Sequence, residues 1–231
     1  MKLSLTGSIA TIAEFFEAGL ASILFQRGLY PPEDWTAVRS RYGLMLQTPA
    51  DPDLAAYLAQ ITSQLENWVV ASKVIIPAIN AQVCCLVLVF TDTETGEPIE
   101  RWHFDLNVVA AAGSDKENAS SSAATSTISS SSKSAPPQPK EEKDIKTVHK
   151  EIAALLKQIT ASCSFLPLIE PSTTTFNVLA YTDKDAKVPL DNTWVDSDAK
   201  MVENAQQVQL RSFSTNHHKV DSVVAYRIAN D

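Results

Sequence analysis

Residues 83–90 are the segment that most constrains the fold. They form an unbroken run, VCCLVLVF, rich in apolar and β-branched side chains. A run of this length without polar alternation fits a strand that is buried on both faces. After a turn that contains Gly96, the large side chains Trp102, Phe104 and Leu106 alternate with polar residues. The two segments together predict a β-hairpin whose second strand has one buried face.

The N-terminal segment predicts the longest helix. Apolar side chains recur at i, i+3, i+4 and i+7 over residues 9–24, which is the spacing of a broad apolar helix face. Thr6 or Ser8 is expected to be the N-cap, and Gly28 the residue just past the C-terminal end. A Pro-Pro pair follows and prevents the helix from continuing.

Weaker patterns give the remaining elements. Pro32 fits a first helical turn, and Trp35, Val38 and Tyr42 then predict a short second helix. The other expected elements are a short strand at residues 44–46, a helix from Asp51-Pro52 to about residue 68, a helix over residues 145–159, and strands at residues 163–168 and 176–182.

The composition changes abruptly over residues 113–143. Ten serines fall between Ser114 and Ser134, and Ile128 is the one large apolar residue in the segment. Such a segment cannot bury enough surface to offset the entropy of ordering it. It is therefore expected to be a disordered loop inside one domain, because the helix that follows needs the earlier sheet to pack on.

The C-terminal segment, residues 183–231, reads as strand and loop without a helix. Residues 208–213 are strand-like, and a second strand follows a polar tip. By period two, one face of that second strand carries Val220, Ser222, Val224, Tyr226 and Ile228. A terminal hairpin can pair with a sheet edge, and in principle with more than one. The expected architecture is a single α+β domain over residues 1–231, with three main helices packed on a largely antiparallel sheet and a mobile C-terminal hairpin that clamps a partner.

Charge and cysteine content exclude several classes of protein. The chain has a net charge of −8 and an isoelectric point near 5.0, which argues against a nucleic-acid partner. No secretory signal opens the chain, and no uninterrupted apolar run reaches the ~20 residues that span a bilayer. Cys84, Cys85 and Cys163 lie in apolar segments and are expected to be buried thiols rather than a disulfide framework.

No catalytic constellation emerges from the sequence, so the chain is not expected to be an enzyme. The six glycines are isolated, which excludes a glycine-rich phosphate loop, and no G-x-S-x-G motif is present. Adjacent residues such as His217 and His218 point to opposite faces of a strand, and none of the four histidines is expected to ligate a metal. No cofactor is expected either. Trp194, alone in a polar region, is either an anchor for the C-terminal segment or a contact for a partner.

Several segments together resemble one family closely. They are AEFF at residues 13–16, SILFQRGLYP at 22–31, ERWHFD at 100–105, QIT at 158–160, FLP at 165–167, AYTDKD at 180–185, RSFST at 211–215 and HKV at 218–220. In this order they resemble the HORMA-domain spindle assembly checkpoint proteins (the mitotic arrest deficient two family), in the fungal form. The resemblance covers nearly the whole chain apart from the serine-rich segment.

The resemblance implies a non-enzymatic protein that switches between an open and a closed fold of one sequence. In the closed form, a partner's closure-motif peptide adds as a strand to a sheet edge, and the C-terminal segment wraps over it as a seat belt. The implied partners are the anaphase-promoting complex activator of the cell-division-cycle twenty type, the coiled-coil kinetochore receptor mitotic arrest deficient one, a checkpoint kinase-like protein, a second copy of the chain and a remodelling AAA+ ATPase. The implied locations are nucleus, kinetochore and cytoplasm, and the implied outcome is a delay of anaphase.

The resemblance also assigns roles to residues. The peptide-binding edge is Phe176, Val178, Leu179, Ala180 and Tyr181, and the seat belt carries Trp194, Leu210, Phe213, His218, Val224 and Tyr226. Self-association would use Lys157, Gln158 and Phe165, and Leu5 would bear on the conformational switch. The family commonly has arginine where Lys157 stands, and lysine lacks the planar fork of arginine.

Three alternatives remain open from the sequence. The first is a HORMA adaptor in DNA-repair polymerase or meiotic chromosome-axis complexes, which would also bind a short peptide. The second is an enzyme with an unrecognised site that includes His218 or the Asp183 and Asp185 pair. The third is a structural β-clamp that does not switch.

Overall fold

The apolar run of residues 83–90 lies in the middle of the main sheet of the protein. A computed structural model describes residues 4–71, 83–109, 143–182 and 194–228. In it, β3 (Val83–Asp92) pairs antiparallel with β4 (Pro98–Val108) on one side and with β5 (Thr174–Thr182) on the other. The strand order is β5-β3-β4-β8-β6, and residues 86–90 of β3 are at most 1% exposed. The predicted hairpin and the burial of β3 on both faces are confirmed.

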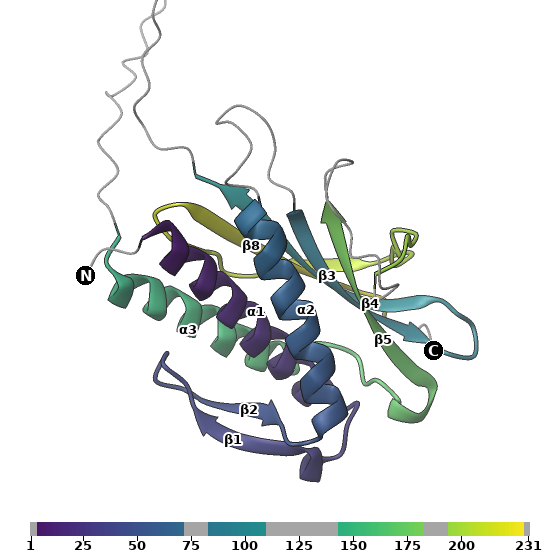
Figure 1. Cartoon of the computed structure of the whole chain (residues 1–231). Helices are drawn as coiled ribbons and strands as arrows, with labels where there is room; N and C mark the ends of the chain where they lie inside the picture. The colour runs from purple at the N-terminus through teal and green to yellow at the C-terminus, as the bar shows by residue number, and fades with distance from the viewer. Residues whose placement is uncertain (1–3, 72–82, 110–142, 183–193, 229–231) are drawn as a thin grey trace, which may run out of the picture.

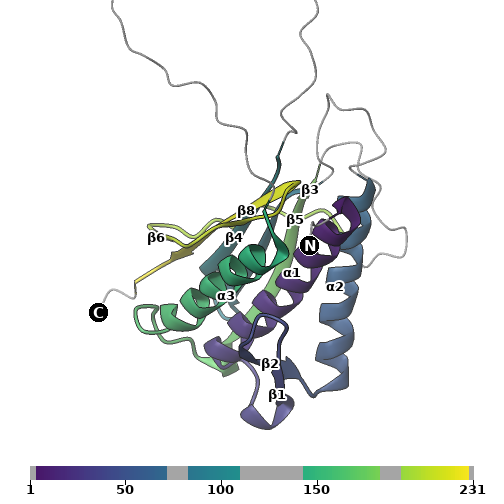
Figure 2. The same ribbon diagram turned by 90° about the vertical axis from the view of Figure 1, so that its left-hand side faces the viewer.

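Three helices cover one face of this sheet, as Figures 1 and 2 show. They are α1 (Leu5–Arg27), α2 (Pro52–Ala71) and α3 (Ile145–Ser162). The Asp51 carboxylate caps α2 by accepting a hydrogen bond from the Leu54 amide at 2.7 Å. The α+β fold class with three main helices is thus confirmed.

Helix α1 begins earlier than the sequence suggests. Ser4 is its N-cap, since its side chain accepts from the Gly7 amide at 3.1 Å, so Thr6 and Ser8 were the wrong candidates. Gly28 ends the helix with a left-handed φ of 67°, as predicted. The helix is long and apolar enough to span a bilayer, but 72% of its most apolar window is buried, as expected of a core helix.

The short helix expected after Pro32 is wrong. One 3₁₀ turn, Pro32–Asp34, leads directly into β1 (Trp35–Arg39), which pairs with β2 (Met45–Pro49). The hairpin packs beside α1, and its turn contains Gly43 at a φ of 76°. The segment of β1 carries a β-branched residue at every second position, which favours a strand. Pairing with β2 stabilises that strand more than the weak helical pattern would stabilise a helix.

The strand expected over residues 163–168 is also wrong. This segment is a set of turns that closes α3, with the Phe165 and Leu166 amides both donating to the Ser162 carbonyl. Pro167 has no amide to give to a strand ladder, and its carbonyl accepts instead from the Arg27 guanidinium. A short 3₁₀ turn, Pro171–Thr173, then leads into β5.

The C-terminal hairpin is formed and joined to the sheet. Strand β8 (His218–Tyr226) pairs along β4, with Val224 opposite Trp102, and β6 (Gln206–Gln209) and β7 (Phe213–Ser214) pair with β8. Alternate residues of β8 are buried from His218 to Tyr226, as the period-two pattern predicts. Ile228 does not extend that face, because the strand ends at Tyr226 and Ile228 is 47% exposed.

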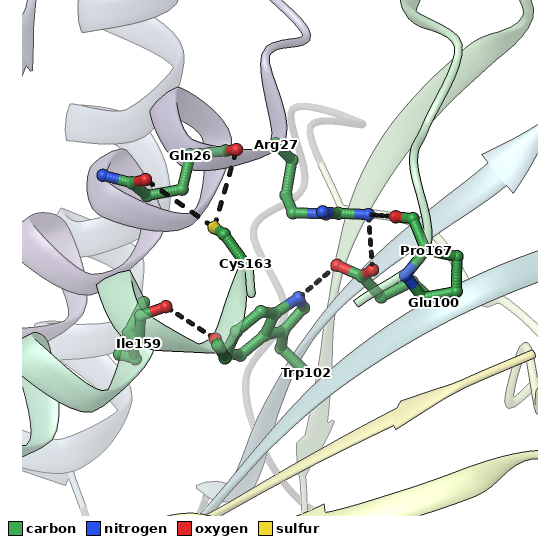
Figure 3. Close-up of polar contacts among 8 residues, drawn as sticks. Gln26, Arg27, Glu100, Trp102, Ile159, Cys163 and Pro167 are labelled. Atoms are coloured by element: carbon green, nitrogen blue, oxygen red, sulfur yellow. Dashed lines mark hydrogen bonds and ion pairs between the residues drawn. The ribbon is translucent and has the colours of Figure 1, made fainter. Parts of the chain in front are cut away.

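A buried ion pair joins the end of α1 to β4 (Figure 3). The Arg27 guanidinium lies 3.0 Å from Glu100 Oε2, and Trp102 Nε1–H donates to Glu100 Oε1 at 2.7 Å. Burial raises the pKa of Glu100, while Arg27 and the Trp102 hydrogen bond act against that rise. Arg27 also donates to the Pro167 carbonyl, so one side chain fixes the α1 terminus, β4 and the segment after α3.

Candidate functional site

The strand β5 forms one edge of the main sheet, and that edge is available for a further strand. Within the described part of the chain, β5 pairs with β3 and has no second neighbour. Phe176, Val178 and Ala180 face the helices and pack against the core, while Leu179 and Tyr181 pack on the outer face. An edge strand presents main-chain donors and acceptors that another segment can pair with.

The C-terminal segment overhangs this edge. Residues 194–199, which we call the strap, form one wall of a cavity of about 350 Å³. The other walls are Trp68 of α2 and residues 178–182 of β5. The site therefore has a main-chain edge on one side and a cover from the same chain on the other.

Two contacts hold the strap in place. The rings of Trp194 and Trp68 meet edge to face, with centroids 4.9 Å apart. On the other face of β5, the Tyr181 hydroxyl donates to the Ala199 carbonyl at 3.4 Å. Trp194 thus anchors the segment, one of the two roles that the sequence left open. Trp68 is 3% exposed, as a core residue of α2 is, yet it also lines the cavity and holds the strap.

Beyond the strap, the chain reaches the opposite edge of the sheet. It passes on the side away from the helices, as Figure 2 shows, and enters β6, which pairs with β8. Val202, on the way, is 8% exposed. The C-terminal segment therefore extends from one edge of the sheet to the other.

The remaining predicted seat-belt residues hold the hairpin on the core. Leu210, Phe213, Val224 and Tyr226 are each at most 7% exposed and belong to the main core cluster. The Phe213 ring packs edge-on to Phe15 of α1 at 4.7 Å. The structure thus separates these residues, which fix the hairpin, from Trp194, which lies at the cavity.

Polar contacts secure the hairpin on both sides of its tip. Ser8 Oγ of α1 lies 2.9 Å from His218 Nδ1, and both residues are buried, at 0% and 4% exposed. On α3, Glu151 Oε2 accepts a hydrogen bond from the Ser214 amide at 3.0 Å. Ser8 was considered only as a helix cap, and nothing along the sequence signals its contact with a residue 210 positions away.

The residues predicted for self-association lie beside the hairpin. Gln158 accepts a hydrogen bond from the Arg211 amide at 2.7 Å, and the Phe165 ring is 6.0 Å from that of Tyr226. Lys157 is exposed on α3, and Phe165 is 42% exposed. Leu5 lies apart from them, as the first residue of α1, and is 36% exposed.

Electrostatics at the mouth of the cavity are acidic. Asp196 and Asp198 of the strap line it, and the hydrogen bond from Lys200 lowers the pKa of Asp198. Asp198 therefore stays ionised at neutral pH, but its ion pair with Lys200 at 3.1 Å offsets part of that charge. With Asp196 beside it, the described lining still favours a cationic side chain over an anionic one.

Fold and site together define an α+β protein whose own C-terminal segment overhangs an unpaired sheet edge, an arrangement that receives an extended peptide by strand addition. The chain belongs to the HORMA domain family, whose model matches residues 8–218. Within that family it groups with the spindle assembly checkpoint proteins, as the curated relatives show.

Those relatives match nearly the full length of the chain. The mitotic spindle checkpoint component mad2 of Schizosaccharomyces pombe is 42% identical, over 97% of this chain and 94% of its own length. The spindle assembly checkpoint protein MAD2A of Homo sapiens is 39% identical, over 98% and 93%. The spindle checkpoint component MAD2 of Saccharomyces cerevisiae is 37% identical, over 97% of both chains.

Solved structures agree with this grouping. A chain in a crystal structure of the mitotic checkpoint complex is 41% identical to this chain, with a TM-score of 0.74, and the match covers 96% of this chain and 99% of that one. Caenorhabditis elegans HTP-2 bound to HTP-3 closure motif 1 has a TM-score of 0.66 at 14% identity, with 98% and 88% covered, and so shares the fold.

Proposed function

We propose that the chain captures closure-motif peptides of checkpoint proteins by strand addition to the β5 edge, under the strap. The observation that carries this proposal is the joint position of the unpaired β5 edge, the cavity of about 350 Å³ and the strap that covers it. Main-chain pairing supplies affinity, and side-chain pockets on either face of β5 supply selectivity. The acidic mouth adds a preference for basic residues in the peptide.

The strap makes release slow. A peptide that lies between β5 and residues 194–199 leaves only after the Trp194–Trp68 contact and the Tyr181–Ala199 hydrogen bond open. Differences in affinity between related complexes are mostly differences in dissociation rate. Retention of a bound peptide is therefore the property that the strap controls.

The hairpin is proposed to switch position, as in a metamorphic protein. In this proposal the described conformation corresponds to the closed form, because β8 pairs with β4 and the β5 edge is left open to a peptide. In the open form, the hairpin would leave β4 and cover the peptide edge. Leu5 is proposed to bear on this equilibrium, since it starts the helix that carries Ser8.

The proposed partners are checkpoint proteins. They are the activator of the anaphase-promoting complex, the coiled-coil kinetochore receptor and the kinase-like protein of the mitotic checkpoint complex, with a remodelling AAA+ ATPase to reopen the fold. The similarity to a chain of the mitotic checkpoint complex supports this set. The chain would act in mitosis as a non-enzymatic adaptor, at kinetochores and in the nucleus and cytoplasm, to delay anaphase.

Self-association is proposed to use the face formed by Lys157, Gln158 and Phe165. Gln158 and Phe165 contact the hairpin through Arg211 and Tyr226, so that face has this form only while the hairpin is on β4. A second copy in the other conformation could then distinguish closed from open molecules.

Residues 113–143, proposed to be a disordered spacer, lie almost wholly outside the described residues. The start of the C-terminal segment, residues 183–193, also lies outside them.

An adaptor role in DNA-repair polymerase or meiotic-axis complexes is not favoured. The three relatives named above are spindle checkpoint proteins at 37–42% identity. The HORMA proteins bound to closure motifs share 14% or less with this chain, which supports the fold alone. An enzymatic role has no support from the cavity, whose described lining holds carboxylates and one tyrosine as its titratable groups.

The decisive experiment is chromatography of the purified chain with and without a closure-motif peptide from the anaphase-promoting complex activator. Ion exchange should resolve two monomeric species, and the peptide should convert both into one complex that keeps its peptide on dilution. A single species that retains no peptide would overturn the proposal. A single species that does retain peptide would support the strap but identify a clamp that does not switch.

A further inference from the structure

A thiol, an imidazole and a carboxylate meet on the outer face of the sheet, outside the peptide cavity. Cys85 of β3 lies directly opposite Asp105 of β4, and His103 lies two residues before Asp105 on the same face. Cys85 Sγ is 3.9 Å from His103 Nδ1, and His103 Nε2 is 2.8 Å from Asp105 Oδ1. One candidate ligand atom from each residue falls within 4.8 Å of the other two.

These three groups are ligands that zinc prefers. Zinc binds thiolate, imidazole and carboxylate in a tetrahedron, with bonds of roughly 2.0–2.3 Å, which places ligand atoms about 3.2–3.7 Å from one another. In the structure the three candidate ligand atoms lie within 4.8 Å of one another, and Cys85 and Asp105 contact opposite ring nitrogens of His103. The half-exposed Asp105 carboxylate must therefore rotate toward the Nδ1 side before all three residues can reach one ion. Paired β-strands supply a rigid frame for the cluster, because cross-strand register fixes the relative positions of all three residues.

The surroundings leave room for a fourth ligand. Cys85 is 3% exposed, whereas the side chains of His103 and Asp105 are 25% and 48% exposed. The cluster is thus closed on the Cys85 side and open to water on the Asp105 side. A site with three protein ligands and one water is the arrangement that zinc adopts where it remains accessible.

Arg101 is the group that opposes a cation here. Its Nη1 lies 3.2 Å from His103 Nδ1, and its Nη2 donates to the Tyr181 hydroxyl at 3.1 Å. The positive charge weakens metal binding, and the guanidinium must turn away from Nδ1 before that nitrogen can bind an ion. Two anionic ligands, the Cys85 thiolate and the Asp105 carboxylate, balance the charge of one divalent ion.

We propose that Cys85, His103 and Asp105 bind one zinc ion that cross-links β3 and β4 on the outer face of the sheet. The thiol proton of Cys85 is released to solvent when the zinc–sulfur bond forms. The site is linked to the strap, since Arg101 contacts both His103 and Tyr181, and Tyr181 contacts Ala199. This proposal does not depend on the identity of the captured peptide.

Spacing along the chain hides this cluster. Cys85 and His103 are 18 residues apart, with no CxxC or HxxxH motif around them. The expectation that no histidine ligates a metal rested on sequence neighbours such as His217 and His218. Strand register supplies the juxtaposition that those neighbours lack.

The test is metal binding by the full chain, stripped of metal and titrated with Zn²⁺ and, separately, with Co²⁺. One Zn²⁺ per chain should bind, and Co²⁺ should give a thiolate charge-transfer band with the visible bands of a tetrahedral ion. Cys85→Ser should abolish the charge-transfer band, and His103→Gln should abolish stoichiometric binding. Asp105→Asn should weaken Zn²⁺ binding by at least the roughly 10–100-fold that loss of an outer-shell partner of a metal site costs, because Asp105 is a direct ligand.

The matched control is Cys163→Ser, which removes a half-buried thiol at the end of α3, away from the cluster. It should leave stoichiometry and spectrum unchanged. Circular dichroism of each metal-free variant separates loss of a ligand from loss of the fold. If Cys85→Ser fails to fold, Asp105→Asn still tests the site, because it alters a half-exposed side chain. No stoichiometric Zn²⁺, or binding that survives in all three variants as adventitious surface metal, would overturn the proposal.

Discussion

Ser8 Oγ and His218 Nδ1 lie 2.9 Å apart, although Ser8 is in the first turns of α1 and His218 begins the last strand. Thr215 Oγ1 completes the group at 2.6 Å from Ser8 Oγ, and the three residues are 0%, 4% and 4% exposed. The contact forms with the hairpin in its described position, where β8 pairs along β4. The N-terminal helix therefore carries a polar group whose partners depend on the position of the C-terminal segment.

Replacement of Ser8 by alanine should destabilise the described hairpin position. It removes one partner from each of two buried polar side chains, at a cost of about 1–3 kcal/mol. Hydrogen exchange should show faster exchange of the β8 amides than in the wild type. The matched control is Ser164→Ala, which removes an exposed hydroxyl bonded locally to Ala161 and should leave β8 unchanged. Equal exchange of β8 in both variants would show that Ser8 does not hold the hairpin.

Loss of the strap anchor should speed peptide release. Trp194→Ala removes the edge-to-face contact with Trp68, and such aromatic pairs contribute about 0.5–1.5 kcal/mol beyond buried area. The dissociation rate of a closure-motif peptide should rise roughly 2- to 12-fold, with a smaller change in the association rate. Stopped-flow displacement of a labelled peptide measures both rates. Met201→Ala, in an exposed residue of the same segment, is the control and should release peptide at the wild-type rate.

Local sequence patterns predicted the elements whose signals are strong. The stripe of α1 and the unbroken run in β3 each allow one structure, and the Asp51-Pro52 cap fixes where α2 begins. Residues 35–39 were misassigned because their pattern suits either a helix turn or a strand. Pairing with Met45–Pro49 decides between the two, and that choice depends on tertiary contacts.

The candidate site was predicted only through resemblance. Phe176 to Tyr181 read simply as a strand, and nothing local indicates that it is an edge. That property depends on which strand β8 pairs with. Here β8 pairs with β4, which joins residues more than a hundred positions apart. Trp68 shows the same limit, since its helical period marks it as core while its second role, holding Trp194, depends on the strap.

Removal of the Glu100 carboxylate should destabilise the fold strongly. Glu100→Ala leaves the Arg27 guanidinium, which is 5% exposed, and the Trp102 Nε1–H without their acceptor (Figure 3). Breaking a buried pair in this way costs about 3–5 kcal/mol. Urea denaturation at neutral pH measures the difference. Glu97→Ala is the control, because its ion pair with Arg227 is 54% and 34% exposed and should matter little.

The same carboxylate should give a pH dependence of known sign. Because burial raises the pKa of Glu100, the folded state binds a proton at a higher pH than the unfolded state. By linkage, the contribution of this group to stability is greatest below its ordinary pKa of 4.5 and is lost as the pH rises through the raised value. The advantage of the wild type over Glu100→Ala should therefore grow as the pH falls from neutral toward that range. An advantage that shrinks over the same interval would contradict the raised pKa.

Self-association should respond to the chemistry of Lys157. Lysine offers a point charge where arginine offers a planar fork for two parallel hydrogen bonds, so Lys157→Arg should strengthen pairing and Lys157→Glu should abolish it. Lys157 is exposed on α3, and neither change should alter the folded monomer. Sedimentation velocity over a range of concentrations measures the dimer fraction.

Lys150→Glu makes the same charge change at another exposed position of α3 and serves as the control. If Lys150→Glu weakens pairing as much as Lys157→Glu, then overall charge rather than this face controls association. If pairing depends on Lys157 alone, Phe165→Ala should weaken it as well, because that ring extends the same face beside Tyr226.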